Sequence, residues 1–236
     1  MSDAPKVLVA SPVYSGKDYI FDKWYKTITN LDYPNYSWLI VDNSKGLSYS
    51  TKLRRKGYKN VVHVARDASS RRGIANSSEY IRQHMIKYGY EYVMFIESDL
   101  IPPKNIIDRL IRHCKDVVGA VYEIGFHGSL NNPRRPLLYY HHRDRDGKVS
   151  LKLLPKEEGV KMINQGVIKT PACGLGCTLI SRDIMEKYEF KYAENSTLHS
   201  DMIFYWELWD DGVDVWVDTD IMIPHFNSDW GKVKDR

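Results

Sequence analysis

One stretch of the chain reads Glu91-Tyr92-Val93-Met94-Phe95-Ile96-Glu97-Ser98-Asp99-Leu100-Ile101-Pro102-Pro103. Residues 92–96 form an unbroken run of bulky apolar and aromatic side chains, which is typical of a strand buried on both faces of a sheet. The two prolines cannot continue strand pairing, so Glu97 and Asp99 are expected just beyond the carboxyl end of this strand. Because open α/β sheets bind their ligands at that edge, the stretch predicts a ligand site there.

The two acids of this stretch have two explanations. Carboxylates this close together repel each other unless they share a cation, and a divalent ion that also holds the phosphates of a nucleotide would supply that charge. Alternatively, Glu97 and Asp99 cap a helix that begins near Lys104. The stretch alone leaves both explanations open.

The composition is ordinary for a soluble globular protein. The chain has 236 residues, of which 43% are hydrophobic and 27% are charged, and this length allows a substantial core. The formal net charge of +4 permits an anionic partner without indicating one. The sequence shows no internal repeat, low-complexity tract or linker, and we therefore expect one domain spanning residues 1–236.

The cysteines and the hydropathy of the sequence predict the cellular compartment of the protein. The cysteines Cys114, Cys173 and Cys177 are odd in number and lack the paired partners of a zinc site, so neither a complete disulfide framework nor a zinc cluster is expected. The sequence shows no secretory apolar region and no segment of the ~20 apolar residues that a membrane span requires. We therefore expect a protein of a reducing, cytoplasmic compartment.

Strands and helices alternate over the first half of the chain. Apolar runs predict strands at 6–11, 37–41, 60–64, 92–96 and 117–122, and helical spacing predicts helices at 17–30, 73–88 and 106–114. In the last helix but one, Ile74, Tyr80, Ile81 and Met85 are expected to pack inward. This alternation is typical of parallel βαβ units.

The second half has a different pattern. Segments 134–140 and 149–154 flank a polar turn around Asp146-Gly147, which predicts a hairpin. Strands are expected at 178–180, 213–217 and 221–223, and helices at 181–188 and 200–211. The glycines of segment 171–177 indicate close backbone approach or unusual dihedral angles.

Several short motifs then follow one another in order. They are Ala10-Ser11-Pro12-Val13-Tyr14, Val41-Asp42-Asn43-Ser44, the set Arg71, Gly73, Ala75 and Asn76, Glu97-Ser98-Asp99, the segment 174–182, His199-Ser200-Asp201, and His225. Over residues 6–225 this ordered set resembles the family 2 glycosyltransferases with a GT-A fold. The resemblance implies a Rossmann-like mixed sheet, mostly parallel and flanked by helices, with a nucleotide-sugar half at about 1–122 and an acceptor half, holding the hairpin, at about 123–236.

The resemblance also implies roles for individual residues. The donor-binding residues would be Pro12, Tyr14, Asp42, Arg71, Asn76 and Ser98, and the acceptor-side segment would contribute Gly174, Leu175 and Gly176. The metal ligands would be Glu97, Asp99 and His225, and the catalytic base would be Asp201. Two positions depart from the family pattern. Glu97 stands where the first Asp of an Asp-x-Asp motif is usual, and Ser200 precedes Asp201 where a second acid is common.

These roles imply a metal-dependent, inverting transfer of a sugar from a nucleotide donor, with UDP expected, to an acceptor hydroxyl. A metal held by Asp99 and Glu97 acts as a Lewis acid on the departing diphosphate, and His225 completes its shell. The mixed nitrogen and oxygen ligands suit Mn²⁺, with Mg²⁺ as the alternative. Asp201 deprotonates the acceptor, which would be a glycan, a lipid-linked sugar or a small molecule.

Each charged candidate also has a structural explanation. His225 follows a proline and could be an ordinary surface histidine. Asp201 lies in the first turn of a helix, where the macrodipole favours an acid. Asp42 belongs to an Asp-Asn-Ser segment with turn chemistry, and Arg71 and Arg72 could form a solvated basic turn instead of binding phosphate.

The aromatic candidates are similarly open. Tyr14 and Trp230 could stack on a base or a sugar. Trp206 and Trp209 share the helix of Asp201 and could line an acceptor pocket, although core packing explains both equally well.

Three other functions compete with the glycosyltransferase hypothesis. The basic and aromatic segment 134–145 could bind nucleic acid, which would suit a glycosyltransferase acting on hydroxymethylated bases of viral DNA, although an exposed hairpin tip explains it too. A nucleotidyltransferase would also hold a metal with acids at strand ends, and Ser15-Gly16-Lys17 partly resembles its first loop. A non-catalytic nucleotide-sugar-binding module would fit the missing acid beside Asp201.

Overall fold

The computed structural model describes residues 4–66, 69–125 and 133–227. Its strands are β1 (Val7–Val13), β2 (Tyr36–Asp42), β3 (Val61–His63), β4 (Tyr92–Ile96), β5 (Val117–Ile124), β6 (Arg135–Pro136), β7 (Tyr139–Arg143), β8 (Val149–Leu153), β9 (Val167–Lys169), β10 (Cys177–Ser181) and β11 (Trp216–Ile223). Its helices are the 3-10 turn η1 (Ser15–Lys17) and α1 (Asp18–Ile28), α2 (Ser48–Arg55), α3 (Ser70–Lys87), α4 (Ile106–Ile111), α5 (Lys156–Lys161), α6 (Arg182–Lys187) and α7 (Ser200–Asp210).

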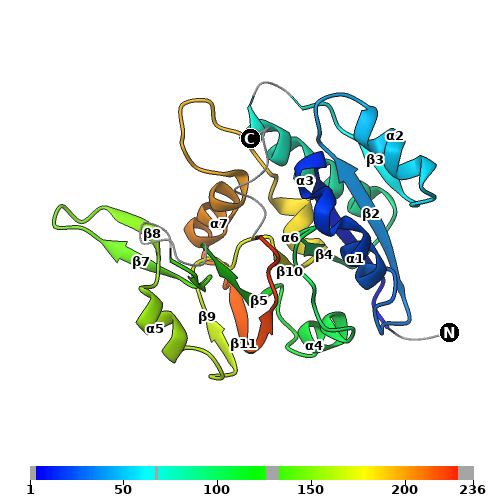
Figure 1. Ribbon diagram of the computed structural model, residues 1–236. Coiled ribbons are helices and arrows are strands. Elements are labelled where there is room, and N and C mark those ends of the chain that lie inside the picture. Colours follow the sequence, from blue (N-terminus) through cyan, green and yellow to red (C-terminus); the bar gives the residue numbers. More distant parts are fainter. Residues whose placement is uncertain (1–3, 67–68, 126–132, 228–236) are drawn as a thin grey trace.

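A mixed sheet runs through the molecule in the order β3-β2-β1-β4-β10-β5-β11-β9, with β6 paired to β5 (Figure 1). The four strands β3, β2, β1 and β4 are mutually parallel, as the βαβ pattern predicts. Strand β10 runs antiparallel between β4 and β5, so strands from the second half of the chain complete the sheet begun by the first. The carboxyl ends of β1 and β4 therefore lie at the same edge of the sheet.

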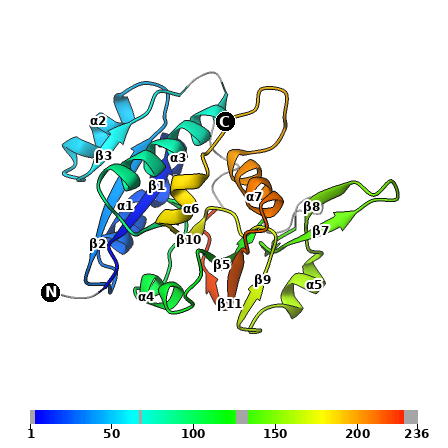
Figure 2. The ribbon, with the colours of Figure 1, turned by 180° about the vertical axis from the view of Figure 1, so that it is seen from behind.

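Helices cover both faces of this sheet (Figures 1 and 2). Along β1, Val7 and Val9 face a core shared with α1, α2 and α4, whereas Leu8 and Ala10 face a core shared with α3, α6 and α7. This alternation follows from the two-residue period of a strand. Because both faces are covered, the inner strands are apolar on both sides, which explains the unbroken apolar run at 92–96.

The hairpin differs from its prediction at one end. Strands β7 and β8 pair antiparallel across the expected turn and project from the side of the body (Figure 1). Residues 135–136 belong instead to the main sheet, where they form β6 against β5. Arg134 contributes to this placement, because its Nε lies 2.8 Å from a carboxylate oxygen of Glu123 on β5. The basic segment 134–145 is therefore divided between two parts of the fold.

Other differences concern one helix, the last strand and the exposure of two side chains. Helix α2 was not predicted, and its first turn is held by the carboxylate of Asp42, which accepts the Ser50 N–H at 2.9 Å. The two strands expected at 213–217 and 221–223 are the single strand β11, whose register shifts against β5 between Asp218 and Met222. Ile81 and Met85 pack inward as expected, but Ile74 and Tyr80 are exposed.

None of the helices in the described ranges combines the length and the apolar character that a membrane span requires.

Candidate active site

The three predicted metal ligands come together at the carboxyl end of β4. One ligand atom from each of Glu97, Asp99 and His225 lies within 4.8 Å of the others. They meet because the segment after β11 pairs with the segment after β4: the Phe226 N–H donates to the Asp99 carbonyl at 2.8 Å, and Leu100 forms a β-bridge with His225. A helix-capping role for the two acids is thus excluded, since no side chain caps α4.

The imidazole of His225 has a fixed orientation. Its Nδ1 lies 2.6 Å from the backbone carbonyl oxygen of Glu123, and because a carbonyl only accepts, Nδ1 must carry the hydrogen. Nε2 is then directed at Asp99, 3.2 Å from Oδ2. Burial lowers the pKa of His225, but the adjacent carboxylate of Asp99 outweighs this effect, so the pKa is raised overall.

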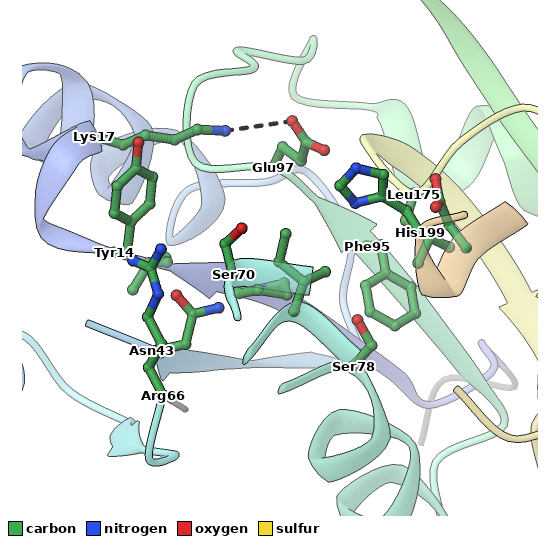
Figure 3. A pocket seen from close by; sticks show the side chains of 14 residues that line it. Tyr14, Lys17, Asn43, Arg66, Ser70, Ser78, Phe95, Glu97, Leu175 and His199 are labelled. Atoms are coloured by element: carbon green, nitrogen blue, oxygen red, sulfur yellow. Dashed lines mark hydrogen bonds and ion pairs between the residues drawn. The ribbon is translucent and has the colours of Figure 1, made fainter. Parts of the chain in front are cut away.

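Lys17 contacts both acids from the other side. Its ammonium nitrogen lies 2.9 Å from Oδ1 of Asp99 and 3.4 Å from Oε2 of Glu97, and Figure 3 shows its side chain extending toward Glu97. Burial disfavours the charged form of Asp99, but Lys17 and His225 more than compensate and lower its pKa to about 2. Asp99 is consequently a fully buried carboxylate that stays ionised. Lys17 contacts its Oδ1, whereas Oδ2, which faces Nε2 of His225, has no hydrogen bond among the described residues.

This group of side chains fits a divalent metal of the manganese type. Two carboxylates and one imidazole form the mixed oxygen and nitrogen donor set expected for Mn²⁺. A histidine that ligates a metal commonly donates its second ring N–H to a backbone carbonyl, as His225 does here. In this structure the positive charge beside the two acids is supplied by the ammonium of Lys17.

A cavity of about 520 Å³ opens beside the acids. The expected residue Pro12 lines it from the end of β1. The turn that follows β1 adds the expected residue Tyr14 and also Lys17 (Figure 3). The guanidinium of Arg66, which sequence reasoning missed, lies 6.0 Å from the ring centroid of Tyr14 and lines the same cavity. The cavity therefore combines an aromatic ring with two cations, next to the acid cluster.

Helix α3 presents one face to this cavity. Ser70, Ile74 and Ser78 line it at intervals of four residues, which explains why the apolar Ile74 is exposed. The predicted donor residue Asn76 is two positions from Ile74 and Ser78, about 200° around the helix, and is exposed on the opposite face. The structure therefore does not bring Asn76 into the cavity.

The carboxylate of Asp42 is hydrogen-bonded to the protein backbone. Its buried carboxylate accepts the N–H groups of Ser44 and Ser50, each at 2.9 Å, and lies 3.2 Å from Nδ1 of His63. These contacts match the turn explanation of this residue. Its neighbour Asn43 lines the cavity instead. Asn43 therefore faces the ligand space in place of the expected Asp42, because strand β2 ends at Asp42 and the chain turns there.

The predicted phosphate-binding arginines bind the loop before α7. The guanidinium of Arg71 donates to the Ser196 carbonyl, and Arg72 lies 2.6 Å from a carboxylate oxygen of Glu194. Neither arginine is among the described residues that line the cavity. Ser98 is also fully buried away from it, with its hydroxyl lacking a hydrogen-bond partner among the described residues.

The glycine-rich segment packs on a buried tyrosine. A Cβ atom at Gly176 would lie 2.4 Å from Cζ of Tyr122, and one at Gly174 would lie 2.7 Å from its Oη. Gly174 also has a φ of +65°, in the left-handed region. The carbonyl of Gly176 accepts the Glu97 N–H at 2.8 Å, so this packing helps to position the acid. Leu175, between the two glycines, lines the cavity.

We therefore expect Gly176→Ala to destabilise the protein by about 1–3 kcal/mol, the usual result of overpacking a buried contact. Chemical denaturation of both proteins measures this difference. Gly159→Ala is the matched control: its new Cβ would make only ordinary contacts with Pro136, at 3.6 Å or more, and helix α5 favours alanine over glycine. Equal stability of Gly176→Ala and wild type would contradict the packing argument.

Asp201 lies in the first turn of α7 and lines the wall of the cavity beside this helix. Burial raises the pKa of Asp201 above the usual range, and the charge of Glu97 adds to this effect. His199, which precedes the helix, is exposed and lines the same wall. A carboxylate with a raised pKa beside a cavity is suited to accept a proton.

Trp206 lies on another face of α7. Its ring centroid is 5.0 Å from that of Trp209 and 6.1 Å from that of His141 on β7. The described lining of the cavity does not include it, so its assignment to the acceptor stays a prediction. Trp230, the other aromatic candidate, lies outside the described residues.

Solved structures with the same fold support the resemblance noted in the sequence. The chain matches a structure of GalNAc-T7 with UDP, GalNAc and Mn²⁺ (10% identity, TM-score 0.61, covering 95% of this chain and 44% of that one). It also matches a Pyrobaculum calidifontis mannosyltransferase with GDP-Man and Mn²⁺ (16% identity, TM-score 0.61, covering 94% and 57%). A third match is S. aureus TarS with UDP-GlcNAc (12% identity, TM-score 0.55, covering 92% and 57%).

These matches confirm the expected GT-A fold, with its mixed sheet flanked by helices. The chain spans about half the length of each of these three structures. No protein-family model matches the sequence, and no curated protein matches it. At sequence identities this low, the structural similarity establishes the fold alone. The argument for function must therefore come from the residues of the site.

Proposed function

We propose that this chain is a metal-dependent, inverting glycosyltransferase that moves a sugar from a nucleotide donor, with UDP expected, to an acceptor hydroxyl. One observation carries the proposal: a single cavity is lined both by the half-buried base candidate Asp201 and by Glu97, whose carboxylate belongs to the proposed three-residue metal cluster. Cavities at the carboxyl edge of a parallel sheet are where α/β proteins bind nucleotides. The base candidate and the acid cluster therefore border the same ligand space.

The donor would occupy the part of the cavity between the β1 loop and α3. Tyr14 and Asn43 would contact the base, and Lys17 and Arg66 would lie against the diphosphate. Glu97, Asp99 and His225 would hold the metal. When bound, the metal supplies Lewis-acid stabilisation of the departing diphosphate.

The transfer step would be a direct displacement. The acceptor oxygen forms a bond to the anomeric carbon while the bond from that carbon to the diphosphate oxygen breaks. The acceptor proton passes to a carboxylate oxygen of Asp201, and the bonding electrons leave with the diphosphate, near Lys17 and Arg66. Attack opposite the leaving group inverts the anomeric centre. The raised pKa of Asp201 makes its carboxylate a stronger base than an exposed aspartate.

Hydrolysis of donors tests the proposal without knowledge of the acceptor. A panel of UDP- and GDP-sugars is incubated with Mn²⁺, Mg²⁺ or EDTA, and the released nucleotide is measured. We expect slow, metal-dependent release from one donor, which also identifies the sugar. Absence of release from every donor, together with no donor-induced rise in melting temperature under any metal, would contradict the proposal.

The same assay, extended to a nucleoside triphosphate and accompanied by a DNA-binding measurement, separates the competing functions. A nucleotide-sugar-binding module would show the rise in melting temperature without release of nucleotide. A nucleotidyltransferase would release pyrophosphate from a nucleoside triphosphate and leave nucleotide sugars intact. A DNA-modifying transferase would bind duplex DNA with a steep salt dependence, which binding at 50 and 200 mM salt would reveal.

A further inference from the structure

The ammonium of Lys17 lies within the proposed metal cluster. Its nitrogen is 2.9 Å from Asp99 and 3.4 Å from Glu97, and only 12% of its side chain is exposed. The second oxygen of Asp99 lies 3.2 Å from Nε2 of His225. Lys17 thus contacts both proposed carboxylate ligands, and the third proposed ligand, His225, contacts Asp99.

This arrangement opposes a divalent cation at the same carboxylates. A metal bound by Asp99 and Glu97 would lie close to a fixed positive charge in a partly buried place, where like charges repel more strongly than in water. It would also compete for Oδ1 of Asp99, which the ammonium already contacts. Metal binding is therefore disfavoured for as long as the ammonium keeps both contacts.

The lysine has an alternative place nearby. Lys17 lines the 520 Å³ cavity as well as contacting the acids, and Arg66 lines the same cavity. A lysine carries its charge on a flexible four-carbon stem, so the ammonium can move without a change in the backbone. A diphosphate in the cavity would offer it new acceptor oxygens and negative charge.

We propose that Lys17 is an exchangeable counter-ion of the acid pair, which couples the binding of the divalent metal to the binding of the donor diphosphate. This inference rests on the proposed function. When a diphosphate enters, the ammonium transfers its contacts from the carboxylates to phosphate oxygens, and the carboxylates become available to the metal. By linkage, the diphosphate must raise metal affinity by the same factor as the metal raises diphosphate affinity.

Mn²⁺ binding to wild type, Lys17→Met and the control Lys52→Met tests this coupling. Titrations monitored by electron paramagnetic resonance are made with and without saturating UDP. Lys52 suits the control because it is exposed and pairs with Asp18, next to Lys17 in sequence, at 2.6 Å, without contacting the acids. We expect UDP to raise the Mn²⁺ affinity of wild type and Lys52→Met by about 5- to 150-fold, a typical coupling factor.

Lys17→Met should show a different pattern. Its Mn²⁺ affinity without UDP should rise at least fivefold, because the competing charge is gone. Its UDP affinity in EDTA should fall, because one cation of the cavity is lost. UDP should then raise its Mn²⁺ affinity by a much smaller factor than in wild type.

Lys17→Arg provides a second variant in case Lys17→Met folds poorly. Arginine keeps the positive charge and can hold a carboxylate through two parallel hydrogen bonds. We therefore expect Lys17→Arg to bind Mn²⁺ more weakly than wild type, opposite in direction to Lys17→Met. Equal Mn²⁺ affinity of wild type and both variants would overturn the inference while leaving the proposed function intact. Absence of Mn²⁺ binding from all proteins, with or without UDP, would overturn both.

Discussion

Asp201→Asn is expected to lower the rate of sugar transfer by about 10²–10⁴-fold, the usual contribution of a positioned general base. Asparagine has nearly the same shape but cannot accept the acceptor's proton. Because Asp201 does not belong to the metal cluster, the variant should keep wild-type affinities for Mn²⁺ and for the donor. Transfer kinetics and calorimetric titrations measure the two parts of this prediction.

The same substitution should stabilise the protein at neutral pH. Burial raises the pKa of Asp201 in the folded state above its unfolded value, so the fold disfavours the ionised carboxylate. The protonated carboxyl group of Asp201 contributes to the free energy of unfolding in full below the unfolded pKa of about 3.9. This contribution is lost as the pH rises through the pKa of the folded state. The melting temperature of Asp201→Asn should therefore exceed that of wild type by an amount that grows with pH from about 4 towards neutrality.

Asp211→Asn, at the other end of α7, is the matched control. The Lys187 ammonium and the Tyr188 hydroxyl hold the pKa of Asp211 below its usual range, opposite in sign to Asp201. This variant should keep the wild-type transfer rate and should gain no stability at neutral pH. If Asp201→Asn retained full transfer activity, the base would have to be another residue. His199, on the same wall, would be the next candidate.

Asp99→Asn is expected to have the second large effect. Metal stabilisation of a leaving group contributes several kcal/mol, so its loss should lower metal-dependent hydrolysis and transfer about a thousandfold. The variant also removes the charge that faces both Lys17 and His225. Removing one partner of a buried ion pair costs about 3–5 kcal/mol, so a clear fall in melting temperature should accompany the loss of activity.

Measuring stability against pH in the acid range separates the loss of the Asp99 charge from general damage to the fold. The pKa of Asp99 is lowered to about 2, and the stability from its charge is present above the unfolded pKa of about 3.9 and lost as the pH falls through the folded value. Wild type should lose this contribution between about pH 4 and about pH 2, and Asp99→Asn should lack that part of the titration.

Asp108→Asn serves as the control for Asp99→Asn. Asp108 forms an exposed pair with Arg112 on helix α4 at 2.6 Å, and such pairs contribute only about 0.3–0.5 kcal/mol. This variant should resemble wild type in Mn²⁺ binding, hydrolysis and melting temperature. Undiminished metal-dependent hydrolysis in Asp99→Asn would remove Asp99 from the proposed metal site.

Much of the fold was predictable from local patterns in the sequence. The apolar run at 92–96 identifies a doubly buried strand, and Pro102-Pro103 place Glu97 and Asp99 beyond its end. Helix α7, whose first turn holds Asp201, and the hairpin turn around Asp146-Gly147 were found in the same way. Strand and helix periods, prolines and glycines act over a few residues, so one chain suffices to read them.

The sequence did not reveal which way several side chains face. Asn76 lies in a predicted helix, but only the packing of α3 against the sheet turns Ser70, Ile74 and Ser78 towards the cavity. Asp42 was placed at the end of its strand, yet the turn and the unpredicted helix α2 use both of its carboxylate oxygens.

The contact between Lys17 and Asp99 depends on the tertiary structure in the same way. The two residues are 82 positions apart in the chain, and they meet because β1 and β4 are parallel neighbours whose carboxyl ends share an edge of the sheet. Local residue patterns thus determined the order of the elements and the position of the acids along the chain. Strand order and helix rotation, which arise from packing between distant segments, decided which side chains surround those acids.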